Sequence, residues 1–388
     1  MWYFSGPQIY FGVDALDYLL EIKGKKAFIV TDETMLQQYF VQQVRQRLVS
    51  AGLESMCFTQ VEPDPSLETV KRCASEMLSY APDWVIGLGG GSCQDAAKAA
   101  WFLYERPDVS LEDINPIENF GLRAKARLIT IPTTAGAGAE VTAAAVLTLP
   151  ESHRKIELPT RELIADITIV DPRFTLNMPR SLTADTGIDA LTHAVEGYSS
   201  SLANDFSDGI CLQAIQMIFE FLPKAVDKGA ADPEAREKMA NAATMAGLGM
   251  TNSHIALCHS LGHSAGAIFN LPHGRITGLF LPFTIEFVGN GGVGRYLHIT
   301  NCLHLTAANE MEAAPQLADA IRYLMQRIGL PLSLSAAGIP RQDFNDRLDL
   351  LVENAQADLS TATSRREASW HDLQRLFEYA YLGKKVDF

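Results

Sequence analysis

The residues best suited to chemistry are an aspartate and several histidines in the C-terminal half. In GIDALTHAVEGY, residues 187–198, Asp189 and His193 are four residues apart. On a helix this spacing places both side chains on one face, within reach of a single ion. We therefore predict that the pair contributes ligands to a metal site.

A second segment, CHSLGHSAGAIFNLPHG, spans residues 258–274 and contains three more histidines. His259 and His263 are again four residues apart, and His273 follows where we expect one helix to end and another to begin. A carboxylate together with imidazoles suits Fe²⁺ or Zn²⁺ and disfavours Mg²⁺ or Ca²⁺. A single histidine is more often an ordinary core or surface residue, but this clustering predicts a divalent transition metal.

Two loops in the N-terminal half are rich in small residues. GLGGGSCQDAAKAA, residues 87–100, is expected to join a strand to a helix, where glycines allow close backbone approach and free N–H groups suit a pyrophosphate. Its spacing is not GxGxxG, so a simple packing turn is the alternative. A second loop, IPTTAGAGAEVT at 131–142, also follows an expected strand. Two such loops together predict a dinucleotide-binding site.

Asp32 lies just past the first expected strand, at the end of KKAFIVTDE. A carboxylate at this position accepts hydrogen bonds from the ribose hydroxyls of NAD, and it repels the 2′-phosphate of NADP. The alternative is that Asp32 is the N-cap of a helix that begins at Glu33. Residues 33–42 contain no arginine to bind a 2′-phosphate, so the position predicts NAD as the cofactor.

The elements that position these residues differ between the two halves. The N-terminal half alternates apolar, β-branched runs with helical periodicity, which predicts a parallel sheet covered by helices. The expected strands lie within 25–33, 83–92, 126–134 and 165–172, and the expected helices within 35–50 and 66–80.

The C-terminal half has long segments of helical periodicity and few β-branched runs, which predicts an all-α domain. We therefore expect an α/β dinucleotide-binding domain with a parallel sheet at 1–181 and an all-α, metal-binding domain at 182–388. The expected helices of the second domain lie within 183–200, 206–222, 233–249, 313–328 and 369–381.

Composition narrows the classes of partner and location. The 388 residues include 32 Lys and Arg and 46 Asp and Glu, which gives a net charge of −14. This charge disfavours binding to nucleic acid and to anionic membranes. The sequence contains no run of 18 or more apolar residues, so we expect no transmembrane helix. The N-terminus lacks the basic and apolar regions of a signal peptide. Six cysteines without a CxxC pair indicate reduced thiols, so we expect a cytoplasmic protein.

Taken together, these motifs resemble those of the iron-dependent (group III) alcohol dehydrogenases. GGGSCQDAAK is similar to that family's GGGSxxDxxK, IPTTAGAGAEVT to PTTxGTGSEVT, GIDALTHAVEGY to GxDALTHAxExY, and HSLGHSAGAIFNLPHG to HxxxHxxGxxxxxPHG. The resemblance covers essentially the whole chain. It implies a dinucleotide-binding α/β domain followed by a helical domain, in agreement with the division expected from the pattern alone.

The resemblance also implies roles for individual residues. His263 would be a catalytic histidine beside the nicotinamide and substrate, and not a metal ligand. The implied metal ligands are Asp189, His193, His259 and His273. The implied cofactor-binding positions are Asp32, Gly89, Gly90, Gly91, Ser92, Asp95, Lys98, Thr133, Thr134, Thr142 and Lys155.

This sequence departs from the family pattern at three places. Cys93 stands where proline is frequent, residues 137–139 read Ala-Gly-Ala in place of Thr-Gly-Ser, and residues 358–369 lack the usual Asn-Pro-Arg. None of these departures changes an implied metal ligand. They affect the expected cofactor contacts and the substrate pocket.

The implied activity is a reversible hydride transfer between a small primary alcohol or diol and NAD, with the alkoxide bound to a divalent metal. The implied metal is Fe²⁺, with Zn²⁺ as the alternative. The apolar residues Phe269 and Leu271 are candidate pocket residues and favour a small substrate. We expect no nucleic-acid or membrane partner, and a homo-oligomer that is a dimer or higher.

Three alternatives remain at this point. A glycerol or polyol dehydrogenase belongs to the same superfamily, but the pairing of His259 with His263 and the presence of His193 favour the iron branch. A dehydroquinate synthase-like lyase would need a basic pocket for a phosphorylated acid, and no Lys/Arg cluster surrounds the histidines. A metal-binding scaffold without enzymatic activity has no use for two dinucleotide loops.

Overall fold

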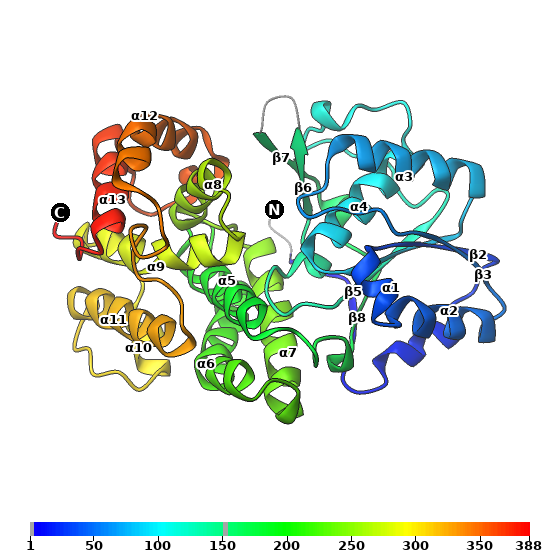
Figure 1. Ribbon diagram of the computed structural model, residues 1–388, viewed down its shortest axis with the longest axis horizontal. Coiled ribbons are helices and arrows are strands. Elements are labelled where there is room, and N and C mark those ends of the chain that lie inside the picture. Colours follow the sequence, from blue (N-terminus) through cyan, green and yellow to red (C-terminus); the bar gives the residue numbers. More distant parts are fainter. Residues whose placement is uncertain (1–3, 150–153) are drawn as a thin grey trace. The chain divides into compact units, whose positions relative to one another are not determined.

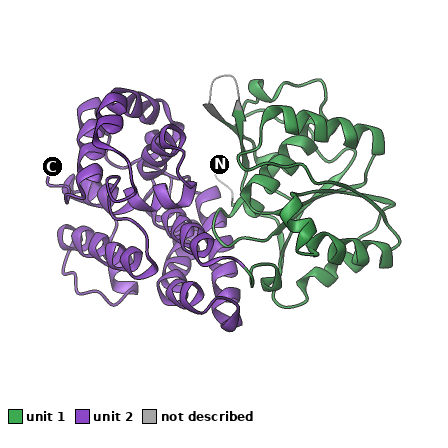
Figure 2. Cartoon of the chain, viewed as in Figure 1, with its two compact units in different colours: residues 1–177 green, residues 178–388 purple. Residues whose placement is uncertain are grey.

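The chain divides into two compact units, one ending at Asn177 and the other beginning at Met178 (Figure 2). The computed structural model describes residues 4–149 and 154–388. The expected nucleotide loops belong to unit 1, and all five expected metal-site and catalytic residues belong to unit 2.

Unit 1 is built on a six-stranded sheet whose strand pairs are all parallel, in the order β1-β8-β5-β4-β2-β3 (Figure 1). This confirms the predicted parallel sheet. The strands are β1 Gln8–Phe11, β2 Lys26–Val30, β3 Glu54–Phe58, β4 Trp84–Gly89, β5 Arg127–Pro132 and β8 Ile167–Val170.

Successive side chains along a strand point to opposite faces of the sheet, so each buried strand contributes apolar residues to both faces. Helices cover both of these faces. In β2, Phe28 and Val30 point into a core shared with α3 (Leu67–Tyr80) and α4 (Gly91–Glu105). The alternate residue Ile29 points into the opposite core, which contains residues of the 3₁₀ helix η1 and of α2. Those two elements are η1 Ala15–Leu20 and α2 Phe40–Ser50.

Three features of unit 1 differ from the sequence prediction. The strands β1 and β3 lie outside all four predicted strand ranges. The single helix expected at 35–50 is two helices, α1 (Glu33–Gln37) and α2, because Tyr39 between them is in the left-handed region with φ 61°. An antiparallel hairpin of β6 (Ala144–Leu149) and β7 (Arg154–Pro159) follows the second loop and was not predicted.

Unit 2 contains helices and no strand among its described residues, which confirms the predicted all-α half. Two helices of this unit were not predicted. The helix α10 (Leu297–Cys302) has only six residues, and α12 (Arg341–Ala357) has only four buried residues and a weak apolar stripe. The helices are α5 Arg180–Ser199, α6 Asp205–Lys228, α7 Pro233–Thr251, α8 Leu257–Phe269, α9 His273–Asn290, α10 Leu297–Cys302, α11 Glu310–Ile328, α12 Arg341–Ala357 and α13 Trp370–Leu382.

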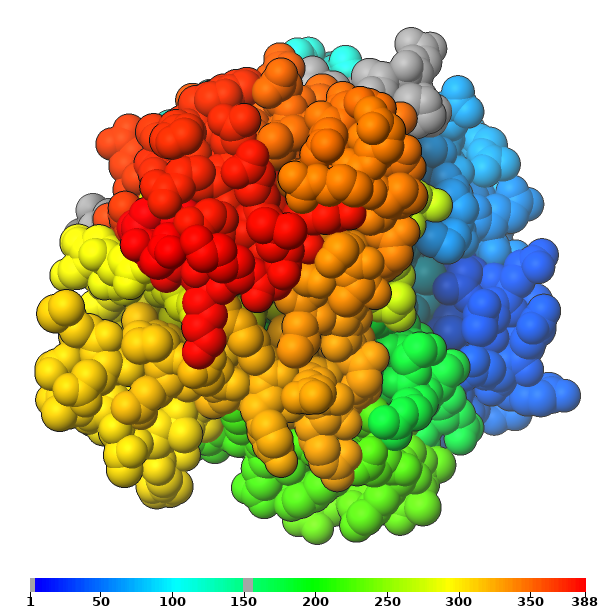
Figure 3. Space-filling view, turned by 60° about the vertical axis from the view of Figure 1, so that its left-hand side comes forward, coloured from blue at the N-terminus to red at the C-terminus, as the bar shows by residue number. Residues whose placement is uncertain are grey.

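The helix α9 forms the centre of unit 2. Its residues from Ile276 to Val288 are all buried, as expected for a helix that is apolar on every side. It packs against α5, α8, α11 and α13. Figure 3 shows the red α13 at the surface, beside the orange segment that contains α12.

The helix α6 is long and apolar enough to cross a membrane by length and composition alone. It packs against α5 and α7 through buried residues such as Ile215 and Leu222. Its solvent-facing side carries an ion pair between Glu220 and Lys224. We therefore interpret α6 as a core helix of unit 2.

Candidate functional site

Four of the expected residues meet at one place in unit 2. Asp189 and His193 extend from α5, His259 from α8, and His273 is the first residue of α9. Each offers one potential ligand atom, and these four atoms lie within 4.8 Å of one another. Three helices that are separate in the sequence therefore bring one carboxylate and three imidazoles together.

The donor set has the properties that a metal ion requires. Nδ1 of His193 and Nε2 of His259 are buried and have no hydrogen-bond partner. A buried polar atom without a partner is costly, and such groups in a native structure indicate a missing ligand, water or ion. A cation held by these nitrogens would remove that cost, so the residues fit a divalent metal.

Glu196 supports His259 from the next turn of α5. Its Oε2 lies 2.5 Å from Nδ1 of His259, and both side chains are buried. Burial raises the pKa of Glu196 to about 7 and lowers the pKa of His259 well below its ordinary value, which favours the neutral imidazole. With Nδ1–H donated to Glu196, Nε2 keeps its lone pair for a metal.

Asp189 is supported in a similar way. Thr277 of α9 donates its hydroxyl proton to Oδ1 of Asp189 at 3.0 Å. Burial alone would raise the pKa of Asp189, but the neighbouring imidazoles, His193 first, lower its pKa below the ordinary value. The carboxylate is therefore ionised, as a metal ligand must be.

A glycine explains how His273 reaches this cluster. A Cβ at Gly274 would lie 2.2 Å from the backbone oxygen of Asp185 and 2.8 Å from Cβ of Asp189. Only glycine therefore lets the first turn of α9 touch α5 directly. This contact leaves Nε2 of His273 3.6 Å from Oδ1 of Asp189.

His263 lies beside the cluster and is not one of its four members. Its ring centroid is 5.6 Å from that of His259 and 5.3 Å from that of His273. Its Nδ1 lies 2.8 Å from Oδ2 of Asp358, a residue that sequence reasoning missed. The only sequence signal was that Asp358 begins the segment that departs from the family pattern.

The apolar pocket candidates lie near the start of α9. Phe269 is the last residue of α8, and Leu271 lies in the short connection to α9; both are half-buried. Cys258 points elsewhere, because its thiol donates to the backbone oxygen of Thr277 at 3.0 Å.

The glycine loop in unit 1 lies between the end of β4 and the start of α4, as predicted. It meets the second loop because β4 and β5 are neighbouring strands: the N–H of Thr133 donates to the oxygen of Gly89 at 3.0 Å. Gly89 has φ +149°, and a Cβ there would lie 2.6 Å from the side chain of Cys93. The loop therefore needs glycine at this position.

Asp32 is a helix N-cap, and it also faces the glycine loop. Its Oδ1 accepts from the N–H of Met35 at 3.0 Å, which confirms the capping interpretation. Its Oδ2 accepts a weaker hydrogen bond from the thiol of Cys93, with a sulfur–oxygen distance of 3.4 Å. Asp32 is half-buried, so capping does not prevent contact with a ligand.

Lys98 has an internal role in unit 1. Its Nζ is buried and donates to the backbone oxygen and hydroxyl of Thr142, each at 2.7 Å, and to the backbone oxygen of Ala144 at 3.0 Å. All three protons of the ammonium group are thus used to hold the end of the second loop against α4.

The other expected cofactor-binding residues lie around these loops. Gly90 caps α4, Gly91 and Ser92 begin it, and Thr133 has a buried hydroxyl with no partner. Thr134 and Asp95 are half-buried. The side chain of Lys155 lies outside the described residues.

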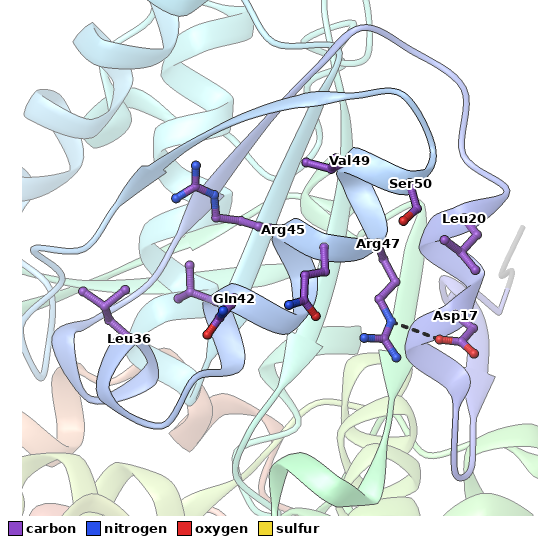
Figure 4. A pocket seen from close by; sticks show the side chains of 10 residues that line it. Asp17, Leu20, Leu36, Gln42, Arg45, Arg47, Val49 and Ser50 are labelled. Atoms are coloured by element: carbon purple, nitrogen blue, oxygen red, sulfur yellow. Dashed lines mark hydrogen bonds and ion pairs between the residues drawn. The ribbon is translucent and has the colours of Figure 1, made fainter.

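A cavity of about 830 Å³ lies elsewhere in unit 1, between η1 and α2 (Figure 4). Leu20, Leu36 and Val49 line it, and an ion pair between Arg47 and Asp17 crosses one side at 3.1 Å. None of the expected site residues lines this cavity, so its size does not locate the chemistry.

Two family models match the chain. Residues 6–172 match the model described as iron-containing alcohol dehydrogenase. Residues 183–381 match the C-terminal model of the Fe-containing alcohol dehydrogenase family. Together the matches cover most of both units.

Curated relatives agree with these matches. The chain is 38% identical over 382 residues to an NADPH-dependent butanol dehydrogenase of Clostridium saccharobutylicum, covering 98% of each protein. It is 35% identical over 396 residues to the bifunctional aldehyde-alcohol dehydrogenase AdhE of Escherichia coli K12. That match covers 95% of this chain but only 44% of the relative, so the chain spans less than half of the bifunctional protein.

Solved structures show the same fold. A 1,3-propanediol oxidoreductase superposes with a TM-score of 0.91 at 28% identity, covering 98% of this chain and all of the other. A sulfoacetaldehyde reductase from Bifidobacterium kashiwanohense, solved in complex with NAD⁺, gives 0.86 at 26% identity and covers 98% of each chain.

Proposed function

Because this chain belongs to the iron-containing alcohol dehydrogenase family, we propose that it is an NAD-dependent alcohol dehydrogenase. It interconverts a small primary alcohol or diol and the corresponding aldehyde. The observation that carries the proposal is the convergence of one carboxylate and three imidazoles within 4.8 Å, with two buried imidazole nitrogens that lack a partner.

The metal site is proposed to use Asp189, His193, His259 and His273, with Fe²⁺ as the ion and Zn²⁺ as the alternative. When bound, such a cation supplies Lewis acidity, which makes a hydroxyl group more acidic and polarises a carbonyl group. Glu196 and Thr277 orient the donor atoms.

The remaining work falls to residues near the cluster. His263 accepts the proton that leaves the alcohol and passes it to solvent, because its side chain is beside the cluster and 28% exposed. Phe269 and Leu271 contact the carbon chain of the substrate and exclude water. The apolar character of these two residues supports a small substrate. So do the names of two similar proteins, a butanol dehydrogenase and a 1,3-propanediol oxidoreductase.

NAD is proposed to bind in the domain at 1–181, while the domain at 182–388 holds the metal. The contacts come from the glycine loop, the second loop and Asp32. The relatives differ in cofactor, since one is named NADPH-dependent and another was solved with NAD⁺. The half-buried carboxylate of Asp32 is the feature of this chain that favours NAD.

The protein is further proposed to be a cytoplasmic homo-oligomer. All six cysteines lie in the described residues and are free thiols, which suits a reducing compartment. Subunit number is measured by light scattering, and a monomer would contradict the proposed assembly.

The activity is tested with anaerobically purified, iron-loaded protein, by following the absorbance of NADH with ethanol, 1-propanol, 1-butanol, 1,3-propanediol and glycerol. We expect turnover with the primary alcohols, inactivation of the iron form by peroxide, and no such effect on the zinc form. Turnover with glycerol alone would indicate a polyol dehydrogenase. Reaction with a phosphorylated keto-acid and with no alcohol would indicate a lyase.

A further inference from the structure

We propose that Asp358 is a positioning residue for the reaction, which holds His263 in one ring orientation and in the tautomer that leaves a lone pair on Nε2. The functional part of this inference rests on the proposed alcohol dehydrogenase activity. The tautomer itself is a property of the folded chain and is measured separately.

The contact between the two side chains is close and partly buried. Nδ1 of His263 lies 2.8 Å from Oδ2 of Asp358, across 95 residues of sequence. The side chain of Asp358 is 18% exposed and that of His263 is 28% exposed. One edge of the imidazole is thus fixed, while the ring still reaches both solvent and the four-residue cluster.

Asp358 is itself held firmly. It caps the short 3₁₀ helix η7 (Leu359–Thr363), and its Oδ1 accepts from the N–H of Ser360 at 2.8 Å. The hydroxyl of Thr361 in turn donates to Ser260 of α8 at 2.8 Å. Since Ser260 is adjacent to His259, the element that carries Asp358 is tied to the helix that carries both histidines.

The charge state of Asp358 determines the direction of this hydrogen bond. Burial acts to raise its pKa, but hydrogen bonds from His263 and Ser360 outweigh burial and lower the pKa to about 2. An ionised carboxylate only accepts hydrogen bonds, so Nδ1 of His263 must carry a proton. In the neutral ring the lone pair then lies on Nε2.

This arrangement prepares His263 to accept a proton. When the alcohol O–H bond breaks, the electron pair stays on oxygen and the proton forms a new N–H bond at Nε2. The resulting imidazolium is stabilised by Asp358, and the proton leaves from Nε2 to water. The hydride of the same reaction goes to NAD, so charge and electrons balance.

The decisive variant is Asp358→Asn. Asparagine still caps η7, but its amide can donate to Nδ1 and thereby move the ring proton to Nε2. We expect kcat to fall about 100-fold, with KM and metal content unchanged. The double variant with His263→Ala should be no slower than His263→Ala alone, because both changes remove one function.

A matched control is Asp372→Asn, the same change in the exposed capping box at the start of α13, which should leave kcat unchanged. Asp358→Glu retains a carboxylate and should recover part of the rate. Equal activity of wild type and Asp358→Asn, or additive losses in the double variant, would overturn the proposal.

The tautomer is read by ¹⁵N NMR of histidine-labelled, zinc-loaded protein, with the His263 signals identified by their absence from His263→Ala. We expect a protonated Nδ1 in wild type and Asp358→Glu, and a protonated Nε2 in Asp358→Asn. A wild-type ring already protonated at Nε2 would refute the inference. If the wild type oxidises no alcohol but shows the Nδ1–H tautomer, the proposed function fails and the positioning role of Asp358 on His263 stands.

Discussion

Oε2 of Glu196 lies 2.5 Å from Nδ1 of His259, and the two side chains are 5% and 1% exposed. Glu196 follows His193 by three residues in α5, so one helix supplies a potential ligand and also the carboxylate that orients a ligand from α8. The same carboxyl group accepts from the N–H of Cys258 at 2.6 Å, which fixes the start of α8. The orientation of His259 is therefore set before any metal binds.

Glu196→Gln should weaken metal binding. The glutamine amide can donate to Nδ1 of His259, which favours a proton on Nε2, the nitrogen needed for the metal. We expect a 10- to 100-fold loss of affinity, about the usual cost of removing such a partner, measured by competition with a chelator. Glu286→Gln is the matched control: Glu286 is equally buried and pairs with Arg322, so its loss should lower stability and leave metal affinity unchanged.

His259→Ala and His263→Ala should separate metal binding from proton transfer. His259 offers one of the four converging ligand atoms, so its removal should abolish most metal binding and most alcohol oxidation. His263 is outside that set, and His263→Ala should retain metal and lose about 100-fold in rate. The metal content of both variants is measured after gel filtration, and their rates of alcohol oxidation are compared with that of the wild type. Full metal content in the first variant, or equal metal loss in the second, would show that the ligand set is wrong.

Local spacing explains why part of the candidate metal site was predictable. Residues four apart on a helix share a face, so the pairs Asp189/His193 and His259/His263 each indicated a common direction. The position of His273 at a helix start was also predicted, and α9 begins at that residue. These features depend on the immediate sequence and survive folding unchanged.

The supporting contacts depend on tertiary packing and left little trace in the sequence. Asp358 is 95 residues from His263 and resembles any aspartate that caps a turn. Lys98 matched a cofactor position, but its partners, Thr142 and Ala144, lie 44 and 46 residues away. A sequence pattern indicates the face of the helix or strand on which a residue lies, but it does not indicate which distant group that residue will contact.

Lys98→Met should destabilise unit 1, because it leaves the three acceptor atoms on Thr142 and Ala144 without a donor. We expect a loss of about 2 kcal/mol or more in the free energy of unfolding. The loss should grow at alkaline pH: burial lowers the pKa of Lys98 from 10.5 to about 8. Between about pH 8 and pH 10.5 the unfolded wild type binds more protons than the folded wild type. The free energy of unfolding of the wild type therefore rises with pH in this range, and that of the variant, which lacks this group, does not rise with it.

Urea unfolding of both proteins at about pH 7 and about pH 9.5 measures this difference. Lys71→Met, an exposed position on α3, is the control and should have little effect. A Lys98→Met protein of wild-type stability that instead has a raised KM for NAD would indicate a direct role in cofactor binding.

Asp32→Asn should relax the choice of cofactor. Asparagine retains the cap on α1, so the variant removes the negative charge without removing the helix start. A carboxylate a few ångströms from the 2′-phosphate of NADP costs several kcal/mol at an effective dielectric near 20, and about 2.7 kcal/mol already gives a 100-fold preference. We expect wild type to prefer NAD by about that factor or more, and Asp32→Asn and Asp32→Gly to narrow or reverse the ratio of kcat/KM values. Glu33→Gln, at the exposed neighbouring position, should leave the ratio unchanged. A wild type that prefers NADP, or variants with an unaltered ratio, would leave Asp32 with helix capping as its only role.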